Sequence, residues 1–212
     1  MSGFIILAGG GDEHQSKKTD ERFRYYVNKV GVSSTLYIPL ASRSDSHDKA
    51  IEWFMSTYNF LPNTTAITNI DEVSNIFKNS FGAIYIGGGN TGVLASVLRK
   101  YGLDTYIVSQ LKQGAIVYGG SAGAIILGKT IATAPNKELT ISQNLDGLGV
   151  IGDYSVLPHF EAKFQQRDIK IANNYKTKLL GISEDAGVVI KDGNIIEKIN
   201  PDGISEYYKL SK

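Results

Sequence analysis

The chain has 212 residues, a formal net charge of +1 and no cysteine. Hydrophobic residues make up 42% of it and charged residues 20%, which is typical of a folded globular domain and not of a disordered chain. The missing cysteines exclude disulfides, thiolate metal ligands and a cysteine nucleophile. The balanced charge, without long runs of Lys or Arg, argues against nucleic acid as a partner.

The first residues predict a strand. Residues 1–8 place an apolar segment directly at the start, without the basic region of a signal peptide, and a glycine-rich turn follows. No apolar stretch approaches the roughly 20 residues that a bilayer-spanning helix needs. We therefore expect a cytoplasmic protein with no membrane partner.

Short apolar runs alternate with segments of helical period through the first 120 residues. This pattern indicates βαβ units and a mostly parallel sheet. Strands are expected at residues 4–8, 35–39, 65–68, 83–86 and 115–118. Amphipathic helices are expected around residues 23–30, 51–58, 73–77, 93–98 and 104–111.

The pattern changes after residue 128. Residues 129–156 have no clear helix, and short β-like pieces occur near 139–142 and 154–157. A helix is expected over residues 162–175, followed by strands at 179–183, 187–191, 195–199 and 206–208, with a hairpin turn at 191–194. No internal repeat or linker interrupts the chain, so a single domain over residues 1–212 is expected.

Residues 118–124, Tyr-Gly-Gly-Ser-Ala-Gly-Ala, are the most informative stretch. They stand between the apolar runs 115–117 and 125–127, so a strand ends in G-x-S-x-G and turns directly into a helix. Such a nucleophile elbow needs small residues around the serine and holds its hydroxyl above a helix N-terminus. The sequence therefore favours Ser121 as a nucleophile, with an ordinary glycine-rich turn as the alternative.

A serine nucleophile needs a base, and histidine is the usual one near neutral pH. His14 and His47 both lie among polar residues, at a loop and at a helix start. His159 instead follows the strand-like segment 154–157 and has apolar neighbours. We therefore predict His159 as the base, although a buried structural histidine would have similar surroundings.

The third member of a triad orients the imidazole and stabilises its charged form. Glu184 directly follows the predicted strand 179–183, and a parallel sheet would place it on the same carboxyl edge as the elbow and His159. Glu138 lies in the irregular segment and is the alternative acid.

An oxyanion hole requires two convergent N–H donors. The elbow supplies the N–H of Ala122, and the loop Gly-Gly-Gly-Asn at 87–90 brings bare backbone to the same region. A phosphate cradle is the alternative for this loop, but it lacks the lysine of a Walker motif and the spaced glycines of a dinucleotide fingerprint. Three scattered histidines give no metal-ligand spacing, so no metal and no cofactor are expected.

Four motifs occur in one order: Gly-Gly-Gly-Asn-Thr at 87–91, Gly-Gly-Ser-Ala-Gly-Ala at 119–124, Pro-His-Phe at 158–160 and Gly-Ile-Ser-Glu-Asp at 181–185. Together they resemble the serine peptidase family of aspartyl dipeptidase (dipeptidase E) and cyanophycinase. The resemblance covers nearly the whole chain. It implies a class I glutamine amidotransferase-like (flavodoxin-like) fold, a three-layer α/β sandwich with a mostly parallel central sheet.

The resemblance also implies roles for single residues. Ser121 is the nucleophile, His159 the general base and Glu184 the orienting acid, and the backbone of Gly89 and Ala122 forms the oxyanion hole. Because the family's third catalytic residue has also been placed in the segment after the elbow, Glu138 stays open.

One departure from the family concerns the substrate. Dipeptidase E-like enzymes are expected to hold the substrate aspartate with an arginine in the helix after Pro-His-Phe, and the aligned position here is Phe164. Arg167 lies three residues further, on the same face of the expected helix. Arg167 and Asn90 are the candidate substrate-binding residues.

The function that follows is a serine hydrolase, a dipeptidase-like peptidase cleaving short peptides through an acyl-enzyme. Dipeptides with an N-terminal acidic residue are the substrates that the resemblance suggests. A small peptide is the expected partner, and the protein is expected to be a monomer or a homodimer. The alternatives are a non-catalytic amidotransferase-like module that binds a small molecule or a partner, and a nucleotide-binding α/β protein.

Overall fold

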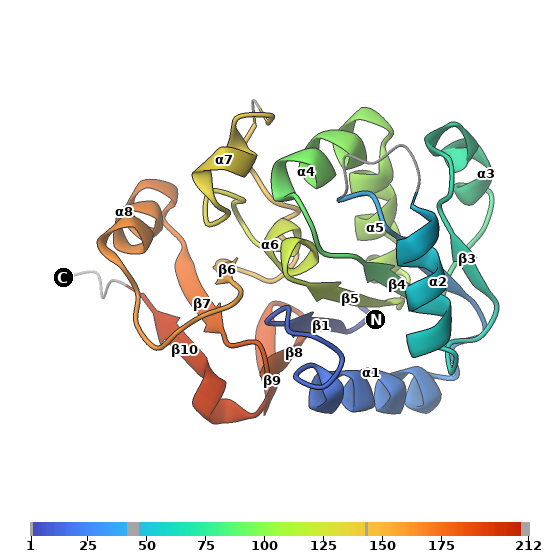
Figure 1. The fold of residues 1–212 in the computed structure, drawn as a ribbon, viewed down its shortest axis with the longest axis horizontal. Coiled ribbons are helices and arrows are strands. Elements are labelled where there is room, and N and C mark those ends of the chain that lie inside the picture. The colour runs from blue at the N-terminus through green and yellow to red at the C-terminus, as the bar shows by residue number, and fades with distance from the viewer. Residues whose placement is uncertain (1, 42–46, 143, 209–212) are drawn as a thin grey trace.

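A computed structural model describes residues 2–41, 47–142 and 144–208. A seven-stranded central sheet lies between two layers of helices, and a three-stranded sheet packs beside it (Figure 1). The strand order of the large sheet is β3-β2-β4-β5-β1-β8-β9. Its strands are β1 (Ile5–Ala8), β2 (Thr35–Ile38), β3 (Thr64–Ala66), β4 (Ala83–Ile86), β5 (Ile116–Gly120), β8 (Gly187–Lys191) and β9 (Asn194–Ile199).

The first five strands of the large sheet run parallel, and the β8–β9 hairpin adds two antiparallel strands beside β1. The predicted α/β class with a mostly parallel sheet is therefore confirmed. Parallel pairing brings the carboxyl ends of β1, β2, β4 and β5 to one edge, where ligand sites of α/β proteins assemble.

The helices connect these strands. They are α1 (Lys17–Val30), α2 (Asp48–Thr57), α3 (Val73–Ile76), α4 (Thr91–Lys100), α5 (Leu103–Lys112), α6 (Ala122–Leu127), α7 (Asn136–Leu139) and α8 (Gln166–Tyr175), with 3-10 turns at Ile70–Glu72 and Pro201–Gly203. In the described part of the chain, no helix has both the length and the apolarity to cross a bilayer.

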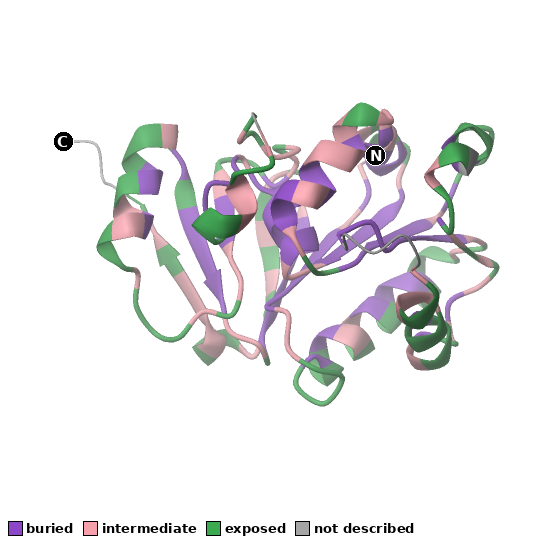
Figure 2. Cartoon of the chain, turned by 45° about the horizontal axis from the view of Figure 1, so that its top comes forward, coloured by how far each residue is buried: buried purple, intermediate pink, exposed green. Residues whose placement is uncertain are grey.

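Successive side chains of each strand point to opposite faces of the sheet, so the core is divided into two layers. Ile6 of β1 packs with Phe23 of α1 and Phe54 of α2 on one face. Leu7 packs on the other face with residues of α4 and α6, such as Leu94 and Ile125. Because both faces of the sheet are covered, its inner strands β2, β4, β5, β1 and β8 are buried almost throughout, whereas the edge strands β3 and β9 and the outer faces of the helices are partly exposed (Figure 2).

Two local predictions were wrong. The β-like piece at 139–142 is a turn that follows α7, with Ser142 N–H bonded to the Leu139 carbonyl. The helix expected from residue 162 begins only at Gln166, because Ala162 has a positive φ of 104° and the Asp168 carboxylate caps the Gln165 N–H at 2.7 Å.

The second sheet has the order β10-β7-β6, formed by β6 (Tyr154–Leu157), β7 (Lys178–Ile182) and β10 (Ile204–Tyr207). The expectation that the strand before Glu184 belongs to the sheet of the elbow was wrong. Strand β5 already pairs with β4 and β1, and β8 takes the remaining side of β1. The pair β6–β7 instead forms a separate sheet with β10.

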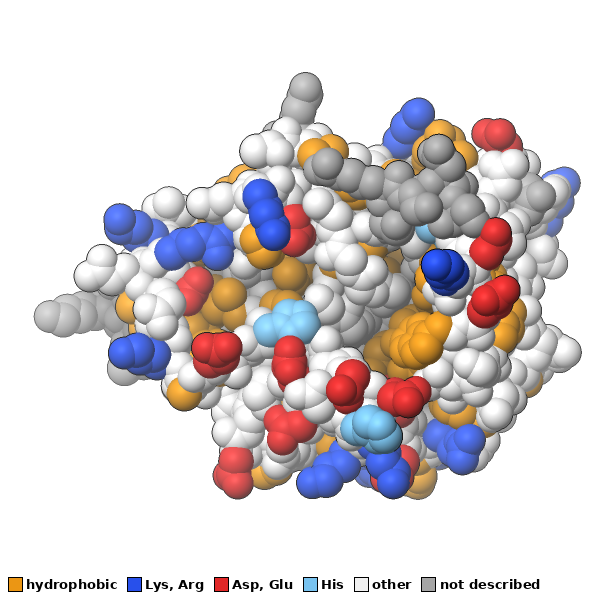
Figure 3. Space-filling model, viewed as in Figure 1, with side chains coloured by type: hydrophobic (Ala, Val, Ile, Leu, Met, Phe, Trp, Pro, Cys, Tyr) orange, Lys and Arg blue, Asp and Glu red, His pale blue; other side chains and the backbone are white. Residues whose placement is uncertain are grey.

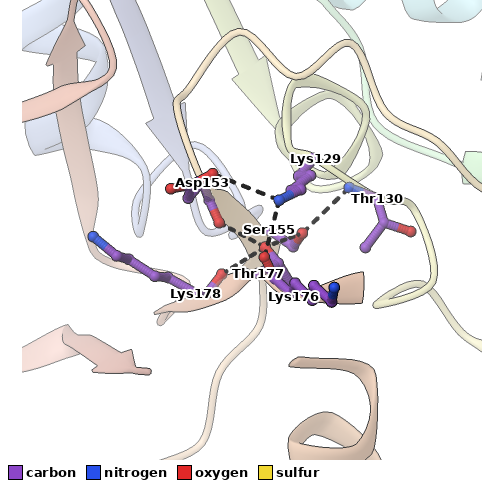
Figure 4. Close-up of polar contacts among 7 residues, drawn as sticks. All are labelled: Lys129, Thr130, Asp153, Ser155, Lys176, Thr177 and Lys178. Atoms are coloured by element: carbon purple, nitrogen blue, oxygen red, sulfur yellow. Dashed lines mark hydrogen bonds and ion pairs between the residues drawn. The ribbon is translucent and has the colours of Figure 1, made fainter. Parts of the chain in front are cut away.

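A cluster of polar side chains connects the starts of β6 and β7 to the segment that follows α6 (Figure 4). The Ser155 hydroxyl lies 3.2 Å from the Thr130 N–H and 2.8 Å from the Thr177 hydroxyl, which donates to the Asp153 carbonyl at 2.7 Å. The Lys129 ammonium donates to the Lys176 carbonyl at 2.9 Å. These bonds satisfy buried polar groups and set the position of β6 and β7.

Candidate active site

Ser121 lies in a sharp turn between β5 and α6. Its φ and ψ are 52° and −115°, a conformation that non-glycine residues rarely adopt. A side chain at Gly119 would come within 2.6 Å of the carbonyl carbon of Gly123, so the turn closes only with glycine at that position. The elbow that the sequence predicts is therefore the local structure that forms.

His159 and Glu184 reach Ser121 from two neighbouring parallel strands. Strands β6 and β7 pair with Leu157 opposite Gly181, so the residues two and three positions further lie side by side. His159 Nε2 lies 3.0 Å from the Ser121 hydroxyl oxygen, and His159 Nδ1 lies 2.8 Å from Glu184 Oε1. The three residues thus form one continuous hydrogen-bonded row.

The ionised form of Glu184 is favoured in this row. The hydrogen bond from His159, followed by one from Gln15, lowers the pKa of the Glu184 carboxyl below its usual value. A carboxylate can only accept, so it selects the imidazole tautomer that carries its proton on Nδ1. Nε2 is then the acceptor for the Ser121 hydroxyl. Both side chains stay partly open to solvent, with 46% of His159 and 43% of Glu184 exposed.

The two predicted sources of an oxyanion hole both lie beside Ser121. Ala122 opens α6, so its N–H has no acceptor within that helix. A side chain at Gly88 would lie 3.9 Å from the Ser121 hydroxyl oxygen, which places the glycine loop after β4 against the nucleophile. Gly89 adopts a φ of 133°, which favours glycine strongly.

Asn90 and Glu138 both serve the start of α4. The Asn90 side-chain oxygen accepts from the Val93 N–H at 2.9 Å and caps the helix. A Glu138 carboxylate oxygen accepts from the Thr91 N–H at 2.9 Å. The structure therefore brings Glu184, and not Glu138, to the imidazole of His159.

The candidate substrate residue Arg167 is engaged elsewhere. Its guanidinium donates to the carbonyl oxygens of Ala132 at 2.8 Å and Thr133 at 3.4 Å, and also to that of Ala134. The expectation that Arg167 shares a helical face with Phe164 was wrong, because α8 begins only at Gln166 and Phe164 lies before it.

The face that Figure 3 shows carries a hollow near its centre, bordered by an imidazole, by carboxylates and by hydrophobic side chains beside α2. Asp and Glu side chains gather along the lower border of this hollow, whereas Lys and Arg side chains lie mainly toward the margins. Over the described residues, no three His, Asp or Glu side chains converge as metal ligands. The charged side chains along the lower border of the hollow are thus mainly carboxylates (Figure 3).

A family comparison decides the class of this chain. The model of peptidase family S51 matches residues 4–198. The chain belongs to peptidase family S51. Among S51-type relatives, an uncharacterised peptidase of Listeria monocytogenes is 33% identical over 128 residues, which are 57% of this chain and 61% of that protein.

Peptidase E of Citrobacter koseri is 31% identical over 133 residues, which are 61% of this chain and 56% of that protein. The chain therefore spans only about 60% of the length of these relatives. A crystal structure of a Listeria monocytogenes protein, provisionally described as a Peptidase E protein, superimposes with a TM-score of 0.70 at 22% identity, covering 92% of this chain and 98% of that one. This similarity shows a shared fold.

Sequence reasoning missed how closely the loop after β1 approaches the row in this S51 chain. The Gly9 carbonyl accepts from the His159 N–H at 2.9 Å. Gly10 has a φ of 95°, and a side chain there would lie 2.7 Å from Ser121 Cβ and 2.9 Å from His159 Nε2. The triple glycine at 9–11 was the signal, because glycines let the backbone approach other groups closely.

We expect Gly10→Ala to reduce activity by at least about 100-fold, because the added methyl pushes Ser121 and His159 apart and a displacement of about 1 Å costs roughly that much. The positive φ adds a loss of stability of about 1 kcal/mol. Peptide hydrolysis and thermal unfolding measure the two effects. Gly31→Ala is the matched control, since Gly31 has a φ of 72° and open space around it. It should lose similar stability and keep activity. Equal activity of the two variants would contradict the steric argument.

Proposed function

We propose that this chain is a serine peptidase that cleaves short peptides through an acyl-enzyme on Ser121. The observation that carries the proposal is the row from Ser121 through His159 to Glu184, with distances of 3.0 and 2.8 Å. Nucleophile, base and orienting acid are recognised by this geometry and not by chain order. A non-catalytic binding module has no need of a complete row at an elbow with positive φ.

In the proposed reaction, Ser121 Oγ attacks the carbonyl carbon of the scissile bond and its proton passes to His159 Nε2. The tetrahedral intermediate collapses when the imidazolium gives this proton to the leaving amine, and an ester to Ser121 remains. A water molecule, deprotonated by the same imidazole, then hydrolyses the ester and frees the serine. Glu184 stays ionised throughout and stabilises the imidazolium.

The backbone of Ala122 and of Gly89 is proposed to stabilise the negative charge that develops on the carbonyl oxygen. The first N–H groups of α6 have no intrahelical acceptors, and the glycine loop after β4 lies against Ser121. Donors fixed in advance need no reorganisation as the charge forms, which is why they contribute strongly to catalysis.

The substrate is proposed to be a short peptide without a required acidic residue. The resemblance to aspartyl dipeptidases suggests an N-terminal aspartate, but a buried carboxylate needs a cationic or multiply hydrogen-bonded partner. Arg167 already binds three carbonyl oxygens of residues 132–134. The carboxylates along the hollow further disfavour an acidic side chain (Figure 3).

We therefore expect Ala-X and Leu-X dipeptides to be hydrolysed with a kcat/KM equal to or above that of Asp-X and Glu-X. Arg167→Met should reduce turnover of Ala-X and Asp-X by the same factor, because the guanidinium supports the 132–134 backbone. Kinetics on the four dipeptides measure both effects. A preference for Asp-X that Arg167→Met selectively removes would contradict the proposed specificity, and no turnover of any peptide would contradict the peptidase.

A further inference from the structure

The loop between β1 and α1 contains a glutamine that contacts the triad acid from the side opposite the imidazole. Gln15 Nε2 donates to Glu184 Oε2 at 2.7 Å, while Gln15 Oε1 accepts from the backbone N–H of Asp12 at 3.0 Å. The Asp12 carboxylate in turn accepts from the N–H groups of His14 at 2.9 Å and Gln15 at 3.0 Å. Both the backbone and the side chain of Gln15 are therefore fixed.

These contacts determine which way the amide points. The backbone N–H of Asp12 can only donate, so the Gln15 atom that faces it must be the oxygen. The amide NH₂ group then faces Glu184. Each carboxylate oxygen has its own partner, with Oε1 accepting from His159 and Oε2 from Gln15. Two anchors on separate oxygens restrict rotation of the carboxylate, which one anchor would leave free.

The packing of the loop leaves room for this contact. A side chain at Gly11 would lie 2.6 Å from Gln15 Cβ and 2.7 Å from the Glu184 carbonyl oxygen. Glycine at this position therefore lets the loop pass close to the residues that follow β7. Gln15 lies 169 positions from Glu184 in the chain, so the contact joins the loop after β1 to the second sheet.

The charged groups around Glu184 explain why a neutral amide, and not a cationic side chain, lies beside its carboxylate. Hydrogen bonds from His159 and Gln15 lower the pKa of Glu184, and the nearby charge of Asp12 raises it. The Asp185 carboxylate is turned to Ser183 and Asn200, with distances of 2.6 Å to each. A cationic donor in place of Gln15 would neutralise Glu184, whereas a neutral amide anchors the carboxylate and leaves its charge for the imidazolium.

We propose that Gln15 is a positioning residue, whose amide holds the Glu184 carboxylate in the orientation that keeps His159 Nε2 directed at Ser121. The inference rests on the proposed peptidase function. Gln15 acts through Glu184, to which its amide donates. If Gln15 only stabilised the loop between β1 and α1, its substitution would lower the stability of the protein and leave the catalytic step unchanged.

Two variants of matched shape test this role. Gln15→Met keeps the length of the side chain and removes the donor. It also removes the acceptor for the Asp12 N–H, which Gln15→Glu retains. Gln15→Met should lower kcat by roughly 10- to 100-fold, the range for a hydrogen bond to a charged group, and leave KM within about 2-fold. Gln15→Glu can still accept from Asp12 but places a second carboxylate against Glu184. The acidic limb of its kcat/KM profile should move to higher pH, because the added charge disfavours ionised Glu184 and stabilises the protonated imidazole.

Gln113→Glu is the control for the charge change. Gln113 is exposed at the end of α5, just before β5 begins, and so lies at the opposite edge of the sheet from Ser121. This variant should keep the wild-type kcat and pH profile. A carbon-13 NMR titration of the Glu184 carboxyl supplies a readout that needs no substrate, and Gln15→Met should move its midpoint to higher pH.

The outcomes separate the two proposals. Wild-type kcat and an unchanged acidic limb in both Gln15 variants would overturn the positioning role while the peptidase stands. If wild-type protein hydrolyses no peptide, the peptidase proposal fails, and with it the catalytic part of the positioning role. The NMR titration still tests the contact, because an unmoved Glu184 midpoint in Gln15→Met would show that Gln15 does not act on this carboxylate.

Discussion

Ser121→Ala is expected to abolish both peptide hydrolysis and labelling by a fluorophosphonate probe. Removing the nucleophile of a triad costs about 10⁶-fold in kcat, because base and acid then have no group to activate. Thermal stability should stay nearly unchanged, since the hydroxyl is only partly buried and its loss leaves little packing unsatisfied. Mass spectrometry of the labelled protein and a thermal melt measure these results.

Ser74→Ala is the matched control for this experiment. Ser74 is exposed on the short helix α3, far along the chain from the elbow. This variant should be labelled and should turn over peptide as the wild type does. Undiminished labelling of Ser121→Ala would assign the reactive group to another residue and would overturn the proposed nucleophile.

The elbow could be predicted because its chemistry is local. A strand of buried residues, a glycine pair, a serine and a second apolar run occupy twelve adjacent positions, and the backbone conformation of Ser121 follows from them. His159 emerged by elimination among three histidines. The central strands were predictable for a similar reason, because short apolar runs alternate along the chain with segments whose hydrophobic residues recur at the helical period.

The residues that support the row of Ser121, His159 and Glu184 come from distant parts of the sequence. The contact of Gln15 with Glu184 and the approach of Gly10 to His159 join the loop after β1 to the second sheet. That sheet itself was not foreseen, because only the full strand order shows that β8 occupies the free side of β1. Neither hydrophobic periodicity nor motif spacing carries this information.

Arg167 shows how a local error changes a functional interpretation. A helix from residue 162 would have placed Arg167 one turn past Phe164, on the same face. The chain instead stays irregular to Gln165, and Phe164 packs against Phe160 and Tyr207 with ring centroids 4.7 and 5.8 Å away. The start of a helix is hard to locate from sequence, and here α8 begins four residues later than expected. The proposed loss of acidic specificity follows from this difference.

Glu184→Gln is expected to lower kcat by about 10⁴-fold at neutral pH, the loss seen when a triad acid becomes an amide. Gln15 gives this loss a specific cause. Its NH₂ group faces the position of Oε2, so the new amide would turn its oxygen to Gln15 and its own NH₂ to His159 Nδ1. An imidazole that accepts at Nδ1 carries its proton on Nε2 and cannot take one from Ser121.

Glu138→Gln is the matched control for this last variant and tests the alternative acid at the same time. The Glu138 carboxylate accepts from the Thr91 N–H, and an amide oxygen can accept that bond equally well. This variant should therefore keep nearly the full wild-type kcat. A large loss in Glu138→Gln with little loss in Glu184→Gln would move the role of the acid to Glu138. Because Gln15 forces the amide at 184 into the unproductive orientation, Gln15→Met combined with Glu184→Gln should recover part of the activity that Glu184→Gln loses alone.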